Sequence, residues 1–372
     1  MLDNPVILAA CHIGPSAATA RRRCEMPNTV AVICVATCRR PKLLLRTLAS
    51  VVNQTSQTPF AVVVVDNDPV ASEGASISDL FFLAGVLRGR CVIEAEPGKC
   101  FAINRALQEA RYRYPSASYI LMIDDDEVAE AEWLDRMIGA CQTKGVDIVG
   151  GPVVPEFPRN SSDICCRHPV YWPVFLRSGY VPTLFCSGNF LIRKEALERL
   201  DSPHFDEGFS ILGGGDIEFF ARCRRSGMTF YWEQQACIVK VVPRSRVNAS
   251  WVLRRGLRIG AINYRIDSSE SHASAGALNL FAKNAALIPV SLFLAVKSQA
   301  RGESLLAVMY PLAVVVGRFL EAFGLGGQYG IIAGNRAKRS PKCGIALRFV
   351  ATIERRMRRM LVSERSVRAN KA

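Results

Sequence analysis

The chain has 372 residues, of which 49% are hydrophobic and 22% are charged, a balance that excludes a wholly disordered, collagen-like or coiled-coil protein. A chain of this length can bury a sizeable core without disulfide or metal staples. Lys and Arg number 47 against 33 Asp and Glu, a formal net charge of +14, and this excess favours anionic partners such as phosphorylated ligands, anionic lipid or nucleic acid.

Residues 30–154 alternate between predicted strands and predicted helices. Continuous apolar runs such as VAVICVA and AVVVVD are typical of strands that are buried on both faces. The predicted strands cover 30–36, 61–66, 91–96, 118–127 and 146–155, and the helices between them cover 41–54, 77–88, 98–113 and 131–145. This alternation predicts an α/β fold with a mostly parallel sheet and helices on both faces. Ligands of such sheets bind at the carboxyl ends of the strands.

A stretch with five prolines, from Pro155 to Pro182, interrupts this pattern. Its composition predicts an ordered loop over a site rather than a strand or helix. Regular structure resumes with a strand and helix over 184–200, a helix over 213–227, and strands over 228–232 and 237–242.

After Asn248 the pattern is helical. Two apolar stretches, 285–296 and 305–316, are each shorter than the ~20 residues that a membrane-spanning helix needs. They predict either a pair of buried helices or an interfacial or re-entrant hairpin. Twelve Lys or Arg and two Glu between 331 and 372 give that segment a net charge of +10. A basic amphipathic pattern of this kind favours an anionic membrane surface. Without a zinc-finger, RNP or basic-zipper pattern, nucleic acid is not expected as a partner.

The sequence therefore predicts four segments. These are a disordered leader at 1–27, an α/β domain at 28–266, an apolar helical membrane-associated segment at 267–330, and a basic tail with an amphipathic helix at 331–372. In the leader the basic residues follow the apolar ones, the reverse of a secretory signal, and Met26 is an alternative start. The thirteen cysteines contain no CxxC, which favours free thiols in a reducing compartment.

Four consecutive acids, Asp124, Asp125, Asp126 and Glu127, end the predicted strand at 118–127. Like charges at contact distance repel one another, so the cluster needs a compensating cation. Hard oxygen ligands suit Mg²⁺ or Mn²⁺, which typically shares its carboxylates with phosphate oxygens. The cluster predicts a metal–diphosphate site, and a solvated acidic turn is the alternative.

Polar residues at other strand ends indicate a nucleotide ligand. They are Asp66 after the second strand, Thr37, Arg39 and Arg40 after the first, and Lys99 and Arg105 near the start of the third helix. An acid at a strand end can accept a hydrogen bond from a base or a ribose, and the start of a helix attracts phosphate. The sequence has no GxGxxG after its first strand and no GxxxxGK[ST], which argues against a dinucleotide oxidoreductase and a P-loop NTPase.

The segment ILGGGDIEFF places Asp216 at the start of a predicted helix, with Glu218 two residues later. Glycines allow the chain to approach a ligand closely. Asp216 either caps its helix or acts as a general base toward an attacking hydroxyl, and both interpretations stay open on these grounds.

Together these motifs resemble the family 2 glycosyltransferases, which have the GT-A fold. FAINRAL resembles the family's ARNxAL helix, MIDDDE its DxD motif, and GGGDIEFF its GGEDxDFF motif, while RRGLRIG is similar to its arginine-rich helix. The order and spacing match from Val30 to Ile266. The similarity is greatest to bacterial exopolysaccharide glucosyltransferases of the succinoglycan type, in which DDDE is followed by GPV.

The resemblance implies an inverting transfer of a sugar, with glucose expected, from a UDP-linked donor to a polyprenyl-diphosphate-linked saccharide. It implies Mg²⁺ or Mn²⁺ as cofactor and a location on the cytoplasmic face of the bacterial inner membrane. The expected donor residues are Thr37, Arg39, Asp66, Asn67, Lys99, Asn104, Arg105, Asp124, Asp125, Arg255 and Arg258. Asp124 and Asp126 are expected to hold the metal, Asp216 to be the catalytic base, and His168, Trp172 and Glu218 to contact the acceptor. Packing within the loop is the alternative for His168 and Trp172.

The chain departs from the family's pattern at one motif. Gly215 stands where the family has the acid before the base, and Glu218 replaces the later Asp. Two other functions therefore stay open: a catalytically degenerate member that acts as a membrane scaffold, and a nucleotidyltransferase, although ATCRRPKLL lacks the glycines of that class's first loop.

Overall fold

Two β-branched runs form the centre of the fold, as the sequence predicts. In the computed structural model β1 (Ala31–Thr37) pairs in parallel with β2 (Phe60–Asp66) on one side and with β4 (Tyr119–Asp124) on the other. The register places Thr37 opposite Asp66 and Ala36 opposite Asp124. Because these strands run in the same direction, their polar last residues meet at one edge of the sheet.

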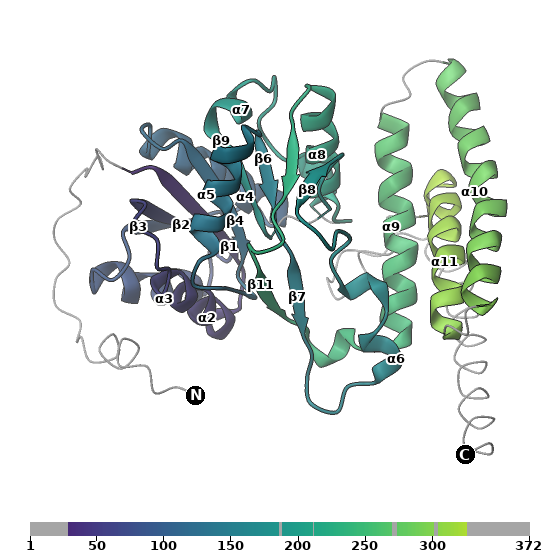
Figure 1. Cartoon of the computed structure of the whole chain (residues 1–372), viewed down its shortest axis with the longest axis horizontal. Helices are drawn as coiled ribbons and strands as arrows, with labels where there is room; N and C mark the ends of the chain where they lie inside the picture. The colour runs from purple at the N-terminus through teal and green to yellow at the C-terminus, as the bar shows by residue number, and fades with distance from the viewer. Residues whose placement is uncertain (1–28, 186–187, 211, 270–273, 301–303, 326–372) are drawn as a thin grey trace. The chain divides into compact units, whose positions relative to one another are not determined.

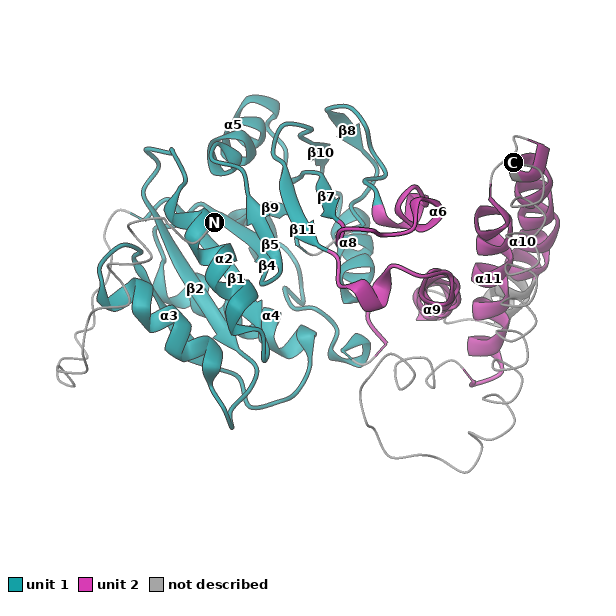
Figure 2. Cartoon of the chain, turned by 90° about the horizontal axis from the view of Figure 1, so that it is seen from below, with its two compact units in different colours: residues 1–156, 172–210, 215–241 teal, residues 157–171, 211–214, 242–372 magenta. Residues whose placement is uncertain are grey.

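The structure describes residues 29–185, 188–210, 212–269, 274–300 and 304–325. Figure 1 shows the elements along the chain, and Figure 2 shows in different colours the two units into which the chain divides. The first, the sheet unit, is drawn from 1–156, 172–210 and 215–241, and the second, the helical unit, from 157–171, 211–214 and 242–372. The predicted leader at 1–27 and tail at 331–372 lie outside the described residues.

The sheet unit contains an eight-stranded sheet and a three-stranded sheet. The order of the larger sheet is β3 (Gly89–Ile93), β2, β1, β4, β9 (Phe190–Arg193), β6 (Ile148–Gly150), β10 (Phe230–Trp232) and β8 (Gly179–Val181). The smaller sheet has the order β5 (Glu127–Ala129), β11 (Ile238–Val241) and β7 (Val153–Glu156). Parallel pairing prevails, and β9 and β8 are antiparallel to their neighbours.

The single strand predicted over 146–155 is wrong, because the chain crosses here from one sheet to the other. β6 ends at Gly150 and β7 begins at Val153. A Cβ on Gly151 would lie 2.2 Å from the carbonyl oxygen of Ala236, so only glycine allows this close backbone approach.

Helices cover both faces of the large sheet, as the sequence predicts. They are α2 (Pro41–Val52), α3 (Glu73–Leu83), α4 (Lys99–Arg113), α5 (Trp133–Lys144), α7 (Lys194–Glu198) and α8 (Gly215–Arg225), with the 3₁₀ turn η2 (Glu207–Phe209) before α8. Ile33 and Val35 point into a buried cluster with side chains of α2, α3 and α5. The Cys34 thiol points the other way, toward the carbonyl of Ala106 on α4. Successive strand residues therefore serve opposite layers, and this explains why the run is apolar throughout.

The helical unit contains three long helices, α9 (Ala249–Ser269), α10 (Ser274–Ala300) and α11 (Leu305–Ala322), which lie side by side in Figure 1. Short elements α6 (Asp163–Cys166), η1 (Pro169–Tyr171) and η3 (Arg244–Arg246) belong to the same unit. The boundary predicted after residue 266 falls inside α9. The apolar stretches at 285–296 and 305–316 are parts of helices of 27 and 18 residues, longer than expected.

Glycines bring α9 and α11 into backbone contact. A Cβ on Gly260 would lie 1.9 Å from the carbonyl oxygen of Val314, and a Cβ on Gly317 would lie 1.9 Å from that of Leu257. Gly256 and Gly260 form a GxxxG pair on α9, and such small-residue spacing allows helices to approach closely, as it does in membrane proteins.

Candidate active site

The acidic cluster lies where β4 ends and β5 begins, at the carboxyl edge of the sheet. Asp124 is the last residue of β4, and Glu127 is the first of β5. The Glu127 carboxylate accepts a hydrogen bond of 2.8 Å from the backbone N–H of Asp124. The Thr47 hydroxyl on α2 donates a hydrogen bond of 2.6 Å to the carbonyl of Glu127, which ties the turn after β4 to α2. One oxygen from each of Asp124, Asp126 and Glu127 lies within 4.8 Å of the other two.

Two lysines neutralise part of this charge. The Lys240 ammonium on β11 lies 2.9 Å from carboxylate oxygens of both Asp124 and Asp126 and 3.0 Å from one of Glu127. The Lys99 ammonium, at the start of α4, lies 2.7 Å from the other oxygen of Asp124. The site therefore has its own positive groups at the centre of the acidic cluster.

The electrostatics of the cluster follow from burial and these ammonium groups. Burial alone would raise the pKa of Asp124, but Lys240 and Lys99 hold that pKa well below its usual range. Burial raises the pKa of Glu127 to about 7. Lys240 opposes this shift, and the negative charge of Asp124 adds to it. Burial lowers the pKa of Lys99, but Asp124 and, more weakly, Asp216 raise it above its ordinary value. Asp216 is therefore close enough to the Lys99 ammonium to contribute to its pKa.

The donor set fits a divalent cation. Three carboxylates converge on one point, and their hard oxygens are the ligands that Mg²⁺ and Mn²⁺ prefer. Asp124 and Asp126, the two metal ligands expected from sequence, belong to this group, and the structure adds Glu127 to it.

Asp125, which the sequence predicts to bind the sugar donor, contacts protein side chains of β1 and the loop after it. It is buried and accepts hydrogen bonds from the Thr37 hydroxyl at 2.9 Å and from the Arg40 guanidinium at 3.1 Å. Burial raises the pKa of Asp125, and Arg40 opposes that shift. Thr37 and Asp125 thus fix the end of β1 against the turn after β4, and their contact with a donor stays a prediction.

The residues after β2 hold the neighbouring loops. Asp66 is fully buried, and its carboxylate accepts backbone N–H groups from Asp68 at 3.2 Å and Ala75 at 3.0 Å. Asn67 binds the β3–α4 loop through its amide, which accepts the N–H of Gly98 at 2.8 Å. Arg39 pairs with Asp68 at 2.8 Å. These side chains shape the strand ends, and their predicted contacts with a nucleotide are not tested.

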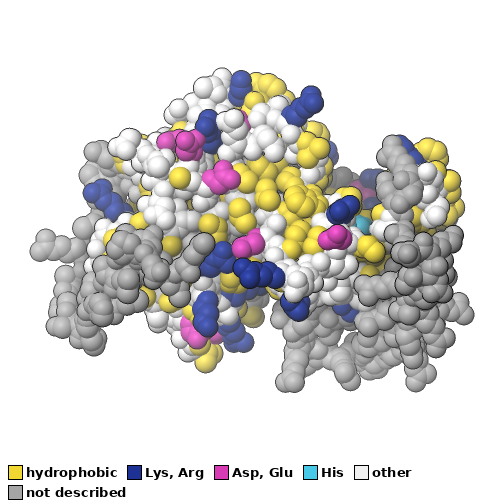
Figure 3. Space-filling view, turned by 60° about the horizontal axis from the view of Figure 1, so that its bottom comes forward, with side chains coloured by type: hydrophobic (Ala, Val, Ile, Leu, Met, Phe, Trp, Pro, Cys, Tyr) yellow, Lys and Arg dark blue, Asp and Glu magenta, His cyan; other side chains and the backbone are white. Residues whose placement is uncertain are grey.

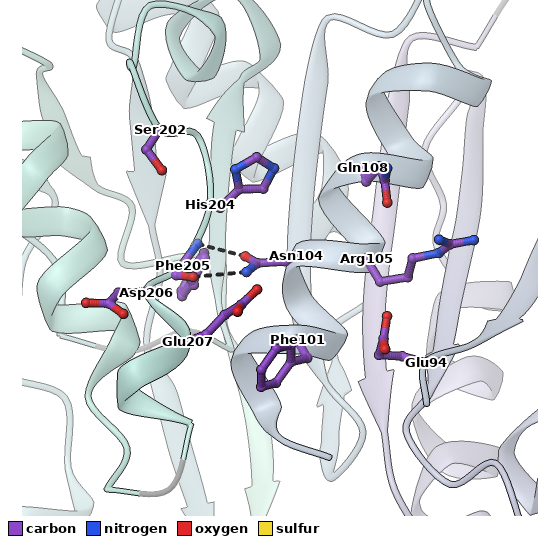
Figure 4. Close-up of a pocket in the computed structure, with 10 residues that line it drawn as sticks. All are labelled: Glu94, Phe101, Asn104, Arg105, Gln108, Ser202, His204, Phe205, Asp206 and Glu207. Atoms are coloured by element: carbon purple, nitrogen blue, oxygen red, sulfur yellow. Dashed lines mark hydrogen bonds between the residues drawn. The ribbon is translucent and has the colours of Figure 1, made fainter. Parts of the chain in front are cut away.

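Helix α4 carries the other expected donor residues. Both polar atoms of the Asn104 amide bind the backbone of Phe205, one accepting its N–H at 2.7 Å and the other donating to its carbonyl at 2.9 Å (Figure 4). Arg105 pairs with Glu109 at 3.0 Å. Both residues line a cavity of about 520 Å³ along the outer face of α4, whose other wall is the segment that precedes α8, with His204 and Glu207.

Asp216 is the second residue of α8, as the sequence predicts. Gly213 and Gly214 before it have φ of 82° and 91°, a region that favours glycine. A Cβ on Gly215 would lie 2.7 Å from the Cys100 thiol, so a side chain at this position requires the cysteine to shift. Glu218 is buried and bound to Arg222 at 2.7 Å, which occupies the carboxylate expected at the acceptor.

The remaining expected residues divide between the units. Arg255, Arg258 and His168 belong to the helical unit, and their contacts with the donor and the acceptor stay predictions. A Cβ on Gly213 would lie 3.8 Å from the Arg258 guanidinium carbon. His168 is buried, accepts the N–H of Val170 at 3.2 Å and packs edge-on against Tyr310, which agrees with its alternative role in packing. Trp172, in the sheet unit, is 44% exposed.

Sequence reasoning missed Lys240. It lies in CIVKVV, a pattern that predicts only a strand, and its position opposite Glu127 depends on the pairing of β11 with β5. A single charged residue within an otherwise apolar strand was the available signal, because a buried ammonium needs a partner.

Comparisons with known proteins agree on the class. The profile of Glycosyl transferase family 2 matches residues 32–201. Succinoglycan biosynthesis protein ExoM from Rhizobium meliloti (strain 1021) is 29% identical over 267 residues, which cover 68% of this chain and 81% of that protein. The solved structure of mannosyltransferase PcManGT from Pyrobaculum calidifontis, in complex with GDP-Man and Mn²⁺, aligns with a TM-score of 0.50 at 18% identity, over 79% of this chain and 88% of that one. Residues 32–201 of this chain, a little under half of its length, are thus similar to glycosyl transferase family 2.

Proposed function

We propose that this chain is a glycosyltransferase, specifically a metal-dependent, inverting hexosyltransferase that uses a nucleoside-diphosphate sugar and a lipid-linked saccharide acceptor. The observation that carries the proposal is the convergence of Asp124, Asp126 and Glu127 at the carboxyl edge of the sheet, with Asp216 acting on Lys99 beside them. The relative in succinoglycan biosynthesis supports a saccharide product, and the neighbour bound to GDP-Man and Mn²⁺ supports a nucleotide-sugar donor and a divalent ion.

In the proposed reaction the acidic cluster binds the metal ion, and Asp216 is the general base. Asp124, Asp126 and Glu127 would hold the divalent ion, which as a Lewis acid supplies charge neutralisation for the diphosphate leaving group. Asp216 accepts the proton of the acceptor hydroxyl. The hydroxyl oxygen then forms its bond to the anomeric carbon as the bond to the diphosphate breaks, which inverts the configuration. Arg255 and Arg258 remain our candidates for holding the departing diphosphate.

The degenerate-scaffold alternative depended on Gly215. A side chain at position 215 would crowd the Cys100 thiol, which is a packing reason for the missing acid. Asp216 keeps its place at the start of α8. We therefore prefer an active enzyme, with UDP-glucose as the expected donor.

The burial pattern of the helical unit supports a membrane partner, because polar side chains are buried and large apolar side chains are exposed. In α10 the buried positions include polar Asn284 and Ser291, whereas Phe293 and Val296 are 65% and 68% exposed. The Arg318 guanidinium of α11 is buried and donates to Asn284 at 2.7 Å and to Asp267 of α9 at 2.6 Å. Apolar groups outside and paired polar groups inside are typical of helices in lipid.

Two further observations favour the same partner. By length and composition α11 could cross a membrane, the one such helix among the described residues. In the sheet unit, the exposed large apolar residues at 172–185 are Trp172, Val174, Leu176, Tyr180 and Phe185. Figure 3 shows one face of the molecule on which hydrophobic side chains gather. We propose that the enzyme works at a membrane surface, where a polyprenyl-linked acceptor is available.

Calorimetric titration with nucleotide tests the donor site. UDP and GDP are added to the full chain with and without Mn²⁺, for the wild type, Asp126→Ala and Asp163→Ala, an exposed carboxylate on α6. We expect metal-dependent binding of UDP that is lost in Asp126→Ala and kept in Asp163→Ala. Binding of GDP alone would correct the nucleotide, and binding of neither in the presence of metal would refute the proposed site.

A further inference from the structure

The Lys240 side chain contacts all three carboxylates of the candidate metal site. Its distances of 2.9, 2.9 and 3.0 Å to Asp124, Asp126 and Glu127 let one ammonium serve each carboxylate with one of its three N–H groups. Its position is fixed by the sheet, since Lys240 stands directly opposite Glu127 in the antiparallel pairing of β11 with β5. Lys99 occupies a different place, because its ammonium lies 2.7 Å from the oxygen of Asp124 that Lys240 does not contact.

An ammonium in this place competes with a divalent ion. The same three carboxylates supply the oxygens that would bind the ion, and two cations repel each other strongly at contact distance where water is largely excluded. With all three acids ionised, the carboxylates and the two lysines carry a formal charge of −1 together. A divalent ion would reverse that sign, and a diphosphate would then neutralise the excess.

We propose that Lys240 is a resident counter-cation that keeps the affinity for free metal low and makes tight metal binding depend on the nucleotide. Entry of the ion displaces the ammonium from at least one carboxylate, and the displaced group becomes available to the diphosphate oxygens. This deepens the proposed function, on which it rests, by assigning an order: metal and nucleotide bind tightly only together.

Binding of Mn²⁺, measured by electron paramagnetic resonance of the free ion, tests this proposal on the full chain. In the absence of nucleotide we expect Lys240→Met to bind Mn²⁺ about tenfold or more tightly than the wild type, equivalent to about 1.4 kcal/mol. With saturating UDP, or GDP if that is the nucleotide bound, the difference should shrink to about threefold or less. Lys283→Met is the matched control, because Lys283 also forms an ion pair, with Asp267 at 2.6 Å in the helical unit, and its loss should leave the affinity unchanged.

The possible results distinguish failure of the proposed role of Lys240 from failure of the proposed function. Equal or weaker binding of free Mn²⁺ by Lys240→Met, with normal nucleotide binding in the wild type, overturns the role of Lys240 alone. Absence of Mn²⁺ binding in both proteins with nucleotide present overturns the metal site as well. If Lys240→Met is unfolded without metal, its thermal unfolding with Mn²⁺ decides: the proposal expects metal to restore the melting temperature, and no restoration refutes it.

Discussion

At the scale of single residues, Gly215 and Cys100 form a matched pair. The family's motif has an acid at the position of Gly215, but a Cβ there would lie 2.7 Å from the Cys100 thiol, which real contacts essentially never show. The other neighbours, Phe205 and Phe209, would be at an ordinary 3.6 Å. The departure from the motif is therefore tied to the cysteine on the first turn of α4.

This pairing predicts a strong coupling between the two positions. Gly215→Ala should cost about 1–3 kcal/mol of unfolding free energy through overpacking, and much less in a Cys100→Ala background, where the obstructing thiol is gone. Chemical denaturation of the two single variants and the double variant measures the coupling. Gly139→Ala, on α5 with no atom within 4 Å of the new Cβ, is the control and should be neutral or stabilising. Strictly additive effects would contradict the pairing.

Asp147 provides a prediction for acid stability. It accepts hydrogen bonds of 2.8 and 2.9 Å from the N–H and hydroxyl of Thr229 and pairs with Arg199. Burial opposes the shift, but these partners lower the pKa of Asp147 below its ordinary value of 3.8. The stabilisation is therefore present above that ordinary pKa and is lost as the pH falls through the lower pKa of the folded state.

We expect Asp147→Asn to melt at a lower temperature than the wild type at pH 7. The difference should shrink as the pH falls below about 4 and close at still lower pH, because the wild-type carboxyl then carries its proton. Thermal unfolding followed by circular dichroism between pH 2.5 and 7 tests this, with Asp163→Asn as the exposed control. A difference that stays constant over this range would show that the charge on Asp147 is not responsible.

At the scale of secondary-structure elements, α4 positions α8 through one amide group. Asn104 on α4 holds both backbone polar groups of Phe205, and the ring of Phe205 stacks on that of Phe219 of α8, with centroids 4.4 Å apart and planes 8° apart. Asp216 begins the same helix. This chain of contacts favours a positioning role for Asn104, whereas the sequence predicts contact with the donor.

Asn104→Ala distinguishes these two roles. The substitution leaves the N–H and carbonyl of Phe205 without their partners, which should cost about 1–3 kcal/mol. A positioning role predicts a lower melting temperature with nucleotide affinity unchanged within about twofold, equivalent to about 0.4 kcal/mol. Gln108→Ala, one turn further along the same cavity wall, serves as the control. A tenfold or greater loss of nucleotide affinity in Asn104→Ala would support the donor role instead.

The sequence predicts the elements better than their connections. The apolar runs that became β1, β2 and β4 are predictable because burial on both faces requires them, and the acids follow β4 directly in the chain. The partners of Asp125 and Asn104 are not predictable in this way. Thr37 and Asp125 are 88 residues apart, and Asn104 and Phe205 are 101 apart. Such contacts depend on the register and packing of elements, which local patterns do not encode.

At the scale of the whole molecule, α10 gives the sharpest test of membrane association. Removing the C-terminal helices would also uncover the glycine face of α9, so truncation confounds lipid binding with folding. Substituting exposed apolar residues avoids that problem, because their side chains make few contacts within the protein.

We expect Phe293→Ser with Val296→Ser to reduce binding to anionic vesicles about tenfold or more, since each large apolar side chain loses about 1.5–3 kcal/mol of burial in lipid. The melting temperature should change little. Val70→Ser with Leu83→Ser is the matched control, as these residues are 88% and 79% exposed in the sheet unit. Co-sedimentation with vesicles provides the measurement. An equal loss in both double variants, or in neither, would argue against α10 as the lipid-facing element.

The glycine contacts between α9 and α11 have a mechanical consequence. Turning α9 about its axis by one residue, ~100°, would bring a larger side chain to the place of Gly260, where 1.9 Å separates a Cβ from the backbone of α11. The backbone contacts therefore hold the two helices at one rotation relative to each other. Arg255 and Arg258 lie on α9, so we expect a rotation of α9 that moves either arginine to move α11 with it.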